Sequence, residues 1–270
     1  MQNIKINKIS KISPSRIGEH PETHKDFNIG SFGISKKCQG EGITICILGS
    51  GLPSHDKLPK ASIFENFTEE KDPMIDVINF STIGAGLISG DGFGLLPDAE
   101  VVFPKIIDNK GNITLSSLMS GLLWACIKQV NVLVLPCSIQ NEFMSDLNSI
   151  LKKVKAMGII VIMPVDKNEE SLEILNTDFV LGVKAGLSKE DNWSIIEEKK
   201  NLMTVCYPKG MKITSTHGAY KYARLLSRES LPFIASSFVG AICSRRKKKR
   251  LSLAYKDVYP EIVSLGSVKK

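Results

Sequence analysis

Short apolar runs bounded by glycine, proline or polar residues recur along most of this 270-residue chain. An apolar run without alternation is typical of a strand buried on both faces, as in a parallel sheet. A sheet with one face in water would instead alternate apolar and polar residues. The pattern predicts buried strands at Ile43–Leu48, Val101–Ile107, Val132–Leu135, Ile159–Met163 and Phe179–Val183.

Helical patterns lie between these runs. After Thr114, a candidate N-cap, apolar residues recur at the spacing of one helix face: Leu115, Leu118, Met119, Leu122 and Cys126. A second helix is predicted from Ser145, a candidate cap, to Gly158, with a buried stripe of Leu147, Ile150, Leu151 and Val154. Strands that alternate with helices imply right-handed crossovers. We therefore expect an α/β fold with a doubly wound, mainly parallel sheet and helices on both faces.

The chain divides into three parts by composition. Residues 1–40 are basic, polar and weakly periodic, and predict an arm packed loosely on the domain. Residues 41–250 carry the strand and helix patterns, without an internal repeat or a linker, and predict one domain. Residues 251–270 predict a C-terminal tail that packs on this domain or trails from it.

Charge and cysteine usage favour an intracellular protein. The net charge of +7 gathers in the arm and in the run Arg245–Arg250, and elsewhere acids and bases mix, which argues against nucleic acid as a partner. The six cysteines have no zinc spacing, so we expect free thiols, a reducing cytoplasmic compartment, and neither metal nor cofactor. No apolar run reaches the ~18 residues of a membrane helix. The first residues lack the apolar core of a secretory signal, and an organellar presequence stays open as an alternative.

Six segments, in order, resemble the subtilisin-like serine proteases. Gly42–Leu58 is similar to the first core strand and turn of that family, G-x-x-V-A-V-[IL]-D-[ST]-G-[IV]-x-x-x-H-x-x-L. Asn79–Gly86, NFSTIGAG, aligns with G-H-G-T-H-V-A-G, and Phe233–Ala241, FIASSFVGA, aligns with S-M-A-[AS]-P-H-V-[AS]-G. The other similar segments are Gly94–Ile107, Leu123–Ser138, and Gly158–Val165 followed by Asp178–Ala185. The resemblance spans about three-quarters of the chain and implies a subtilisin-like fold.

The three motifs that carry the catalytic triad in that family all lack the catalytic residue here. Gly49 holds the Asp position, Phe80 the His position and Phe233 the Ser position. A triad needs a nucleophilic hydroxyl, a base and a carboxylate, and these three residues supply none of them. The resemblance thus implies a degenerate member, a pseudoprotease without catalytic residues. We expect the two phenylalanine rings to pack together, with centroids within ~7 Å. His55 matches a position outside the triad and is expected to be a turn residue.

A residual peptide groove is also implied. The oxyanion motif of the family becomes Met163–Asn168, and Asn168 supplies an amide only if extra residues bulge ahead of it. The substrate-binding edge M-S-[LF]-G-G becomes Leu135–Ile139, where Pro136 has no N–H for a paired substrate. The opposite edge, Lys110–Ile113, stays similar to the family. We expect strand addition by an extended peptide, along a groove formed by Lys110, Gly111, Asn112, Leu135, Pro136, Cys137 and Ser138.

Three hypotheses for function follow. The first is an inactive subtilisin-like protein that binds a peptide or protein, such as a leader peptide or an active protease, and regulates or scaffolds a processing pathway. The second is an active hydrolase with a displaced nucleophile, Cys137 or Ser236/Ser237 with His217. The third is a structural protein whose basic end, Arg245–Arg250, binds a polyanion in a salt-dependent manner. The partner's identity, the oligomeric state and cleavage of the arm are left open.

Overall fold

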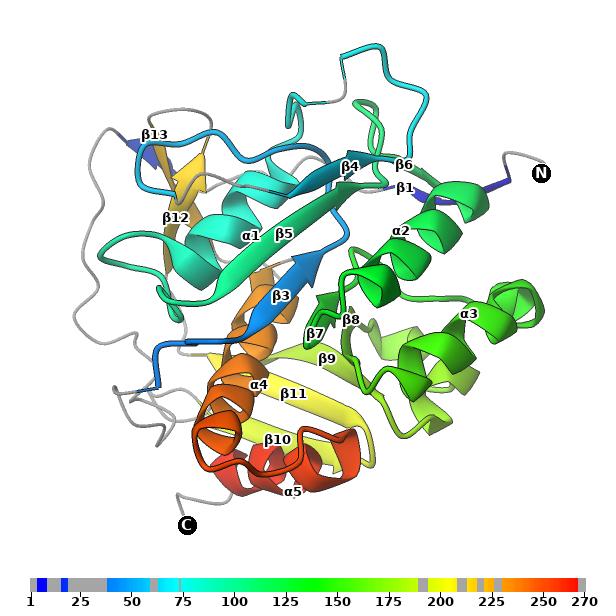
Figure 1. Ribbon diagram of the computed structural model, residues 1–270, viewed down its shortest axis with the longest axis vertical. Helices are drawn as coiled ribbons and strands as arrows, with labels where there is room; N and C mark the ends of the chain where they lie inside the picture. The colour runs from blue at the N-terminus through cyan, green and yellow to red at the C-terminus, as the bar shows by residue number, and fades with distance from the viewer. Residues whose placement is uncertain are drawn as a thin grey trace.

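The computed structural model describes residues 4–8, 16–18, 38–58, 63–72, 74–188, 194–207, 213–217, 221–225 and 230–266. In these ranges a mostly parallel eight-stranded sheet is flanked by helices, with the strand order β10-β11-β9-β8-β7-β3-β5-β4 (Figure 1). The pair β10–β11 is antiparallel, and the other neighbours are parallel. The strands are β3 (Thr44–Ile47), β4 (Phe64–Asn66), β5 (Glu100–Lys105), β7 (Val132–Val134), β8 (Ile160–Pro164), β9 (Val180–Leu187), β10 (Ser194–Lys199) and β11 (Leu202–Tyr207).

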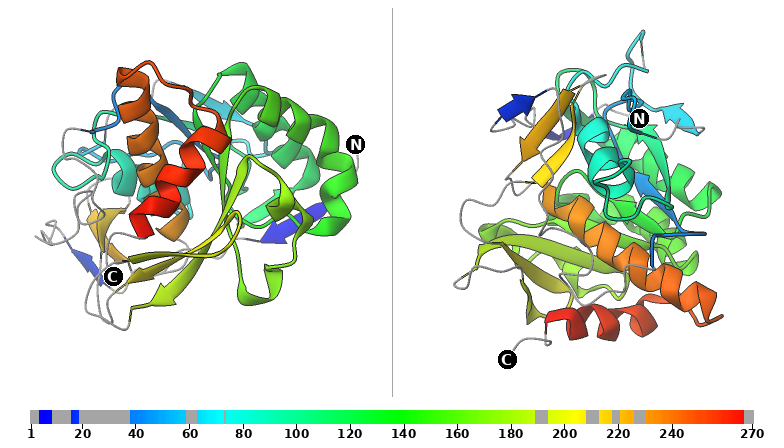
Figure 2. Two further views of the ribbon diagram at one scale, coloured as in Figure 1. Left: turned by 90° about the horizontal axis from the view of Figure 1, so that it is seen from below. Right: turned by 90° about the vertical axis from the view of Figure 1, so that its left-hand side faces the viewer.

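Helices cover both faces of the sheet (Figures 1 and 2). On one face lie α2 (Leu115–Ile127) and α3 (Met144–Ala156), and on the other α1 (Phe80–Ser89), α4 (Leu231–Lys248) and α5 (Tyr255–Gly266). Two glycines show how closely the helices approach the sheet in and next to β3. A Cβ on Gly121 of α2 would lie 2.7 Å from Ile106 and 3.1 Å from Leu48, and one on Gly240 of α4 would lie 3.2 Å from Ile45.

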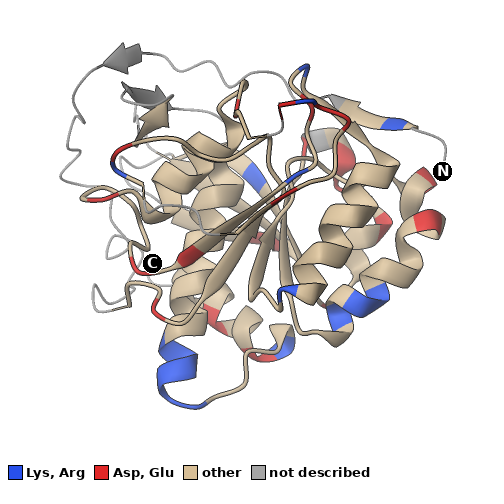
Figure 3. Cartoon of the chain, turned by 45° about the horizontal axis from the view of Figure 1, so that its top comes forward, with Lys and Arg blue, Asp and Glu red and all other residues tan. Residues whose placement is uncertain are grey.

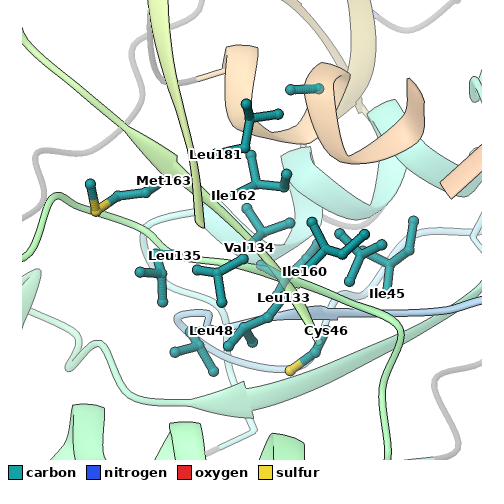
Figure 4. Packing of buried hydrophobic residues seen from close by; sticks show 14 of the residues in the cluster. Ile45, Cys46, Leu48, Leu133, Val134, Leu135, Ile160, Ile162, Met163 and Leu181 are labelled. Atoms are coloured by element: carbon teal, nitrogen blue, oxygen red, sulfur yellow. The ribbon is translucent and has the colours of Figure 1, made fainter. Parts of the chain in front are cut away.

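The core is built where the apolar runs of the central strands meet these two helical layers. Every residue of β7 is buried, and in β8 only the last residue, Pro164, is partly exposed. Figure 4 shows side chains of β3, β7, β8 and β9, with the residues that follow β3 and β7, packed in this region. Burial of such side chains stabilises a fold by about 1.5–3 kcal/mol each, so this cluster holds the sheet to its helices.

The five strands predicted from the apolar runs are all present, as β3, β5, β7, β8 and β9. Thr114 caps α2 as predicted, since its hydroxyl accepts a hydrogen bond from the Ser117 amide at 3.1 Å. Gly158 ends α3 in the left-handed region, at φ 71°, also as predicted. The predicted cap at Ser145 is wrong: α3 begins one residue earlier, after the 3₁₀ turn Asn141–Phe143, and has no side-chain cap.

Two short strands come from the arm, which its weak periodicity did not predict. β1 (Lys5–Lys8) pairs antiparallel with β6 (Asn112–Thr114). β2 (Arg16–Gly18) pairs with β13 (Lys221–Leu225), which pairs in turn with β12 (Ile213–His217). The rest of the predicted arm up to residue 37 lies outside the described residues. In the predicted tail, α5 packs against α4 and β10.

Within the described ranges, no helix has both the length and the apolar composition needed to cross a bilayer.

Candidate functional site

The three positions aligned with the catalytic triad come together at the carboxyl ends of the parallel strands. Gly49 follows β3, Phe80 is the first residue of α1, and Phe233 lies in the first turn of α4. Loops and helix starts at this edge are where α/β sheets place their ligand sites. Segments nearly two hundred residues apart in the chain therefore meet in one place.

Phe80 and Phe233 are in direct contact. Their ring centroids are 5.1 Å apart and their planes are inclined by 60°, an edge-to-face arrangement. Phe80 is 3% exposed and Phe233 is fully buried. The predicted contact between the two rings is therefore present, and apolar carbon fills the space between the first turns of α1 and α4.

Gly84 makes room for the Phe233 ring. A Cβ on Gly84 would lie 2.5 Å from Cε1 of Phe233, closer than real Cβ contacts allow. In the family motif aligned with Asn79–Gly86, the residue at this position is Val. The larger residue at position 233 is thus matched by a smaller one at position 84, one turn along α1 from Phe80.

A second exchange of volume joins Gly49 to Ser81. A Cβ on Gly49 would lie 2.1 Å from Oγ of Ser81. The aligned family motifs have Asp at position 49 and Gly at position 81. In this chain the larger residue of the two is instead at position 81. Oγ of Ser81 accepts a hydrogen bond from the Ser50 amide at 2.8 Å and is fully buried. The serine therefore takes the space in which an aspartate side chain would begin.

Asp76 is a carboxylate beside this pair that sequence reasoning missed. It accepts hydrogen bonds from the amide and the hydroxyl of Thr82, both at 2.7 Å, and from the Ser50 hydroxyl. Asn79, the N-cap of α1, has no side-chain capping bond, and Asp76 accepts from the Thr82 amide in the first turn instead. Desolvation raises the pKa of Asp76 above its ordinary value, against the opposing effect of these bonds. Its position three residues before the N-cap was the available signal.

Both predicted edges of the peptide groove lie near residues 4–8. The pairing register is Lys5 with Thr114, Asn7 with Ile113 and Lys8 with Asn112, and the Leu115 amide donates to the Ile4 carbonyl at 2.9 Å. On the opposite edge, the Asn7 side chain hydrogen-bonds the Cys137 thiol. The segment of the chain that forms β1 therefore contacts both edges.

The two edges are held by local polar bonds. The Asp108 carboxylate accepts from the amides of Lys110 and Asn112, at 2.8 and 2.7 Å, which shapes the turn through Gly111. On the other edge, the Ser138 hydroxyl donates to Glu169 at 2.6 Å. Asn168, the predicted oxyanion residue, is exposed in the 3₁₀ turn Lys167–Glu169, and its neighbour Glu169 is the residue that contacts Ser138.

The candidate displaced nucleophiles are buried. Ser236 and Ser237 are fully buried, and their hydroxyls donate to the Phe233 carbonyl at 2.7 and 3.0 Å. Cys137 is 6% exposed, and burial raises the pKa of its thiol to about 12, which suppresses the reactive thiolate. His217, the proposed base of this hypothesis, is the last residue of β12. His55 lies in a turn as predicted, with its Nδ1 accepting from the Lys57 amide at 3.1 Å.

The basic run begins in the last turn of α4 and forms the blue cluster at the end of that helix in Figure 3. Much of it is engaged within the chain. Arg245 and Arg246 form ion pairs with Glu261, Lys248 pairs with Glu41, and Lys247 donates to the Gly42 carbonyl. Cations at this end also suit the helix dipole. The arrangement therefore has a structural role that needs no polyanion. Among the described residues, no cluster of His, Cys, Asp and Glu is arranged to hold a metal ion.

Comparisons with known proteins point to one family. A subtilisin-like protease of Coccidioides posadasii is 30% identical over 108 residues, which are 39% of this chain and 26% of that protein. Subtilisin-like protease 12 of Arthroderma gypseum is 32% identical over 94 residues, 34% of this chain and 23% of that protein. No family model matches the chain. The matches span about a quarter of each relative, and with the α/β fold they support a relationship to the subtilisin-like proteases.

Proposed function

We propose that this protein is a catalytically inactive relative of the subtilisin-like proteases that acts by binding an extended peptide or protein segment. The observation that carries the proposal is the Phe80–Phe233 contact, 5.1 Å between ring centroids, at the positions where the family has its base and its nucleophile. An aromatic ring neither accepts nor donates a proton at neutral pH. Loss of a whole triad costs on the order of a million-fold in turnover.

The packing around Phe80 and Phe233 also supports the absence of catalytic activity. Ser81 and Gly84 complement Gly49 and Phe233 in volume, so the residues at the aligned triad positions fit their neighbours. Ser236 and Ser237, which follow Phe233 in α4, donate to its main-chain carbonyl and are fully buried. A buried thiol with a pKa of about 12 is a poor nucleophile.

The pairing of β6 with an extended segment supports the binding part of the proposal. Strand addition provides main-chain hydrogen bonds without regard to sequence, and side-chain contacts then give selectivity. In this view the protein regulates or scaffolds a processing pathway, and its partner is a leader peptide or an active protease with an extended segment of suitable sequence.

A covalent probe tests the inactivity directly. Full-length protein is incubated with a fluorophosphonate probe and, separately, with a thiol-directed probe, beside an active subtilisin-like protease as the positive control. We expect neither probe to label the folded protein stoichiometrically, and a protein substrate to remain uncleaved. Stoichiometric labelling that is lost in Ser236→Ala, Ser237→Ala or Cys137→Ser would overturn the proposal and identify a displaced nucleophile.

A further inference from the structure

We propose that residues 4–8 are an exchangeable ligand for the chain's own peptide groove, and that the groove accepts partner segments of the same kind. That kind is an extended segment in which an apolar residue is followed by asparagine. The inference rests on the proposed peptide-binding function and adds to it a regulation and a class of partner.

The main-chain pairing places the segment on the available edge of β6. On one side of β6, Ile113 forms a bridge with Ile107. On its other side, β1 supplies the partner backbone, and the bond from the Leu115 amide to the Ile4 carbonyl extends the contact beyond β6. A peptide from another molecule must therefore displace β1 to pair at this edge.

The side chains of the segment show which positions the groove distinguishes. Ile6 is half-buried and packs against the hydrophobic core, whereas Ile4 is 44% exposed and Lys5 is also exposed. Asn7 reaches the opposite edge and hydrogen-bonds the Cys137 thiol. The apolar contact at Ile6 and the amide contact at Asn7 therefore define the recognised pair.

The small size of the contact makes the segment exchangeable. β1 and β6 form a two-stranded sheet apart from the main sheet, and their register shifts between Lys5 and Asn7. An isolated two-stranded ribbon is only marginally stable, and segments with few buried apolar contacts open at low free-energy cost. A tethered segment competes at an effective concentration in the millimolar range, so occupation in cis lowers the apparent affinity for a free peptide by about tenfold when the intrinsic Kd is near 100 μM.

The first experiment weakens the tethered segment and measures binding of a free one. The probe is a fluorescein-labelled synthetic peptide of residues 1–10, titrated against full-length protein by fluorescence anisotropy. In Ile6→Asp, a carboxylate replaces the half-buried apolar side chain, and we expect the labelled peptide to bind about tenfold more tightly than to wild type. Ile4→Asp is the matched control: it adds the same charge to the same segment at an exposed side chain, and binding should stay at the wild-type level.

The second experiment locks the segment in place. Asn7→Cys puts a second thiol opposite Cys137, and we expect mild oxidation to form an intramolecular disulfide, identified by peptide mapping, that abolishes binding of the labelled peptide. Reduction should restore it. Asn7→Cys/Cys137→Ser is the control that cannot form this bond. Absence of the 7–137 disulfide, or a disulfide between two chains, would overturn the inference.

The outcomes separate this inference from the proposed function. If the peptide binds equally to wild type, Ile6→Asp and the oxidised Asn7→Cys protein, peptide binding stands and control by the tethered segment is refuted. If the disulfide forms but no variant binds the peptide, the recognised class is refuted together with the binding part of the proposed function. Inactivity toward the covalent probes is measured independently of both results.

Discussion

At the scale of single residues, two pairs of complementary volumes explain how Gly49 and Phe233 fit at the positions aligned with the triad. Phe233 faces Gly84, and Ser81 faces Gly49, so each larger side chain meets a glycine. The aligned family motifs have the large and small residues the other way round in both pairs. Protein interiors are packed as densely as organic crystals, so a ring can enter such a site only if a neighbour shrinks.

The Phe233–Gly84 pair predicts coupled stability effects. Gly84→Ala would place a Cβ 2.5 Å from the Phe233 ring, and we expect it to lower the free energy of unfolding by about 1–3 kcal/mol through overpacking. In Phe233→Ala, the ring is gone, and the same change should be neutral or stabilising by up to about 1 kcal/mol, because alanine favours a helix over glycine. Urea unfolding of the wild type, both single variants and the double variant measures the coupling. Equal costs of Gly84→Ala in both backgrounds would contradict the proposed complementarity.

At the scale of elements, α4 connects the candidate site to the opposite end of the molecule. Its first turn carries Phe233, its middle approaches β3 at Gly240, and its last turn carries the basic run. Glu261 of α5 receives both Arg245 and Arg246 from that last turn. The positive charges at the end of α4 therefore bind the neighbouring helix, which positions α4 on the sheet.

The Glu261 contacts predict a pH-dependent contribution to stability. Burial raises the pKa of Glu261, but the bonds from Arg246 and Arg245 outweigh it and hold the pKa below its ordinary value of 4.5. A carboxylate with a lowered pKa stabilises the fold above its unfolded pKa, and this contribution is lost as the pH falls through the folded pKa. Glu261→Gln should cost about 1–2 kcal/mol of unfolding free energy at pH 7, after discounting for partial exposure.

Thermal unfolding of wild type and Glu261→Gln between pH 7 and pH 3 measures this contribution. The difference between the two proteins should shrink below pH 4.5, where Glu261 begins to be protonated in the unfolded chain. Glu41→Gln, which removes the exposed partner of Lys248, is the matched control and should change little. A pH-independent difference for Glu261→Gln would mean that its charge does not contribute.

At the scale of the whole molecule, segments from both ends of the chain complete the structure. β1 pairs with β6, and α5 packs against β10. Three side chains of α5 are buried: Tyr255, Val258 and Ile262. The Tyr255 hydroxyl hydrogen-bonds the Val180 carbonyl at 3.2 Å and the Asn201 side chain at 2.9 Å, which ties the helix to β9 and the β10–β11 turn.

Removal of the C-terminal part should therefore destroy cooperative folding. A chain ending at Arg250 lacks the apolar face that covers the sheet, and we expect it to lose its sharp thermal transition, whereas a chain ending at Gly266 should unfold like wild type. Tyr255→Phe is a milder variant, which should fold and lose about 1–2 kcal/mol because two buried polar partners lose a bond. Calorimetry distinguishes these results. A native-like transition for the chain ending at Arg250 would refute the role of α5.

The contrast between predicted and missed features follows from how far apart the contributing residues lie. The central strands were predictable because an uninterrupted apolar run such as Val132–Leu135 indicates by itself a strand that is buried on both faces. β10 was missed because Ile195 is its one buried residue and the rest of Ser194–Lys199 is polar or exposed, so no run or alternation marks it. β1 was missed because its pairing uses main-chain groups, which every polar segment also has.

The same distinction holds at the candidate site. The aligned motifs predict which residues stand at the triad positions and that Phe80 and Phe233 should meet, since each motif is local. Other features depend on contacts between distant segments. These are the fit of Ser81 and Gly84 against Gly49 and Phe233, the bond of Asp76 to the first turn of α1, and the pairing of residues 5–8 with β6. Local patterns determine burial and element type, because these depend on neighbouring residues. Only the tertiary structure decided which side chains pack against one another, because residues far apart in the sequence fill the same space in the core.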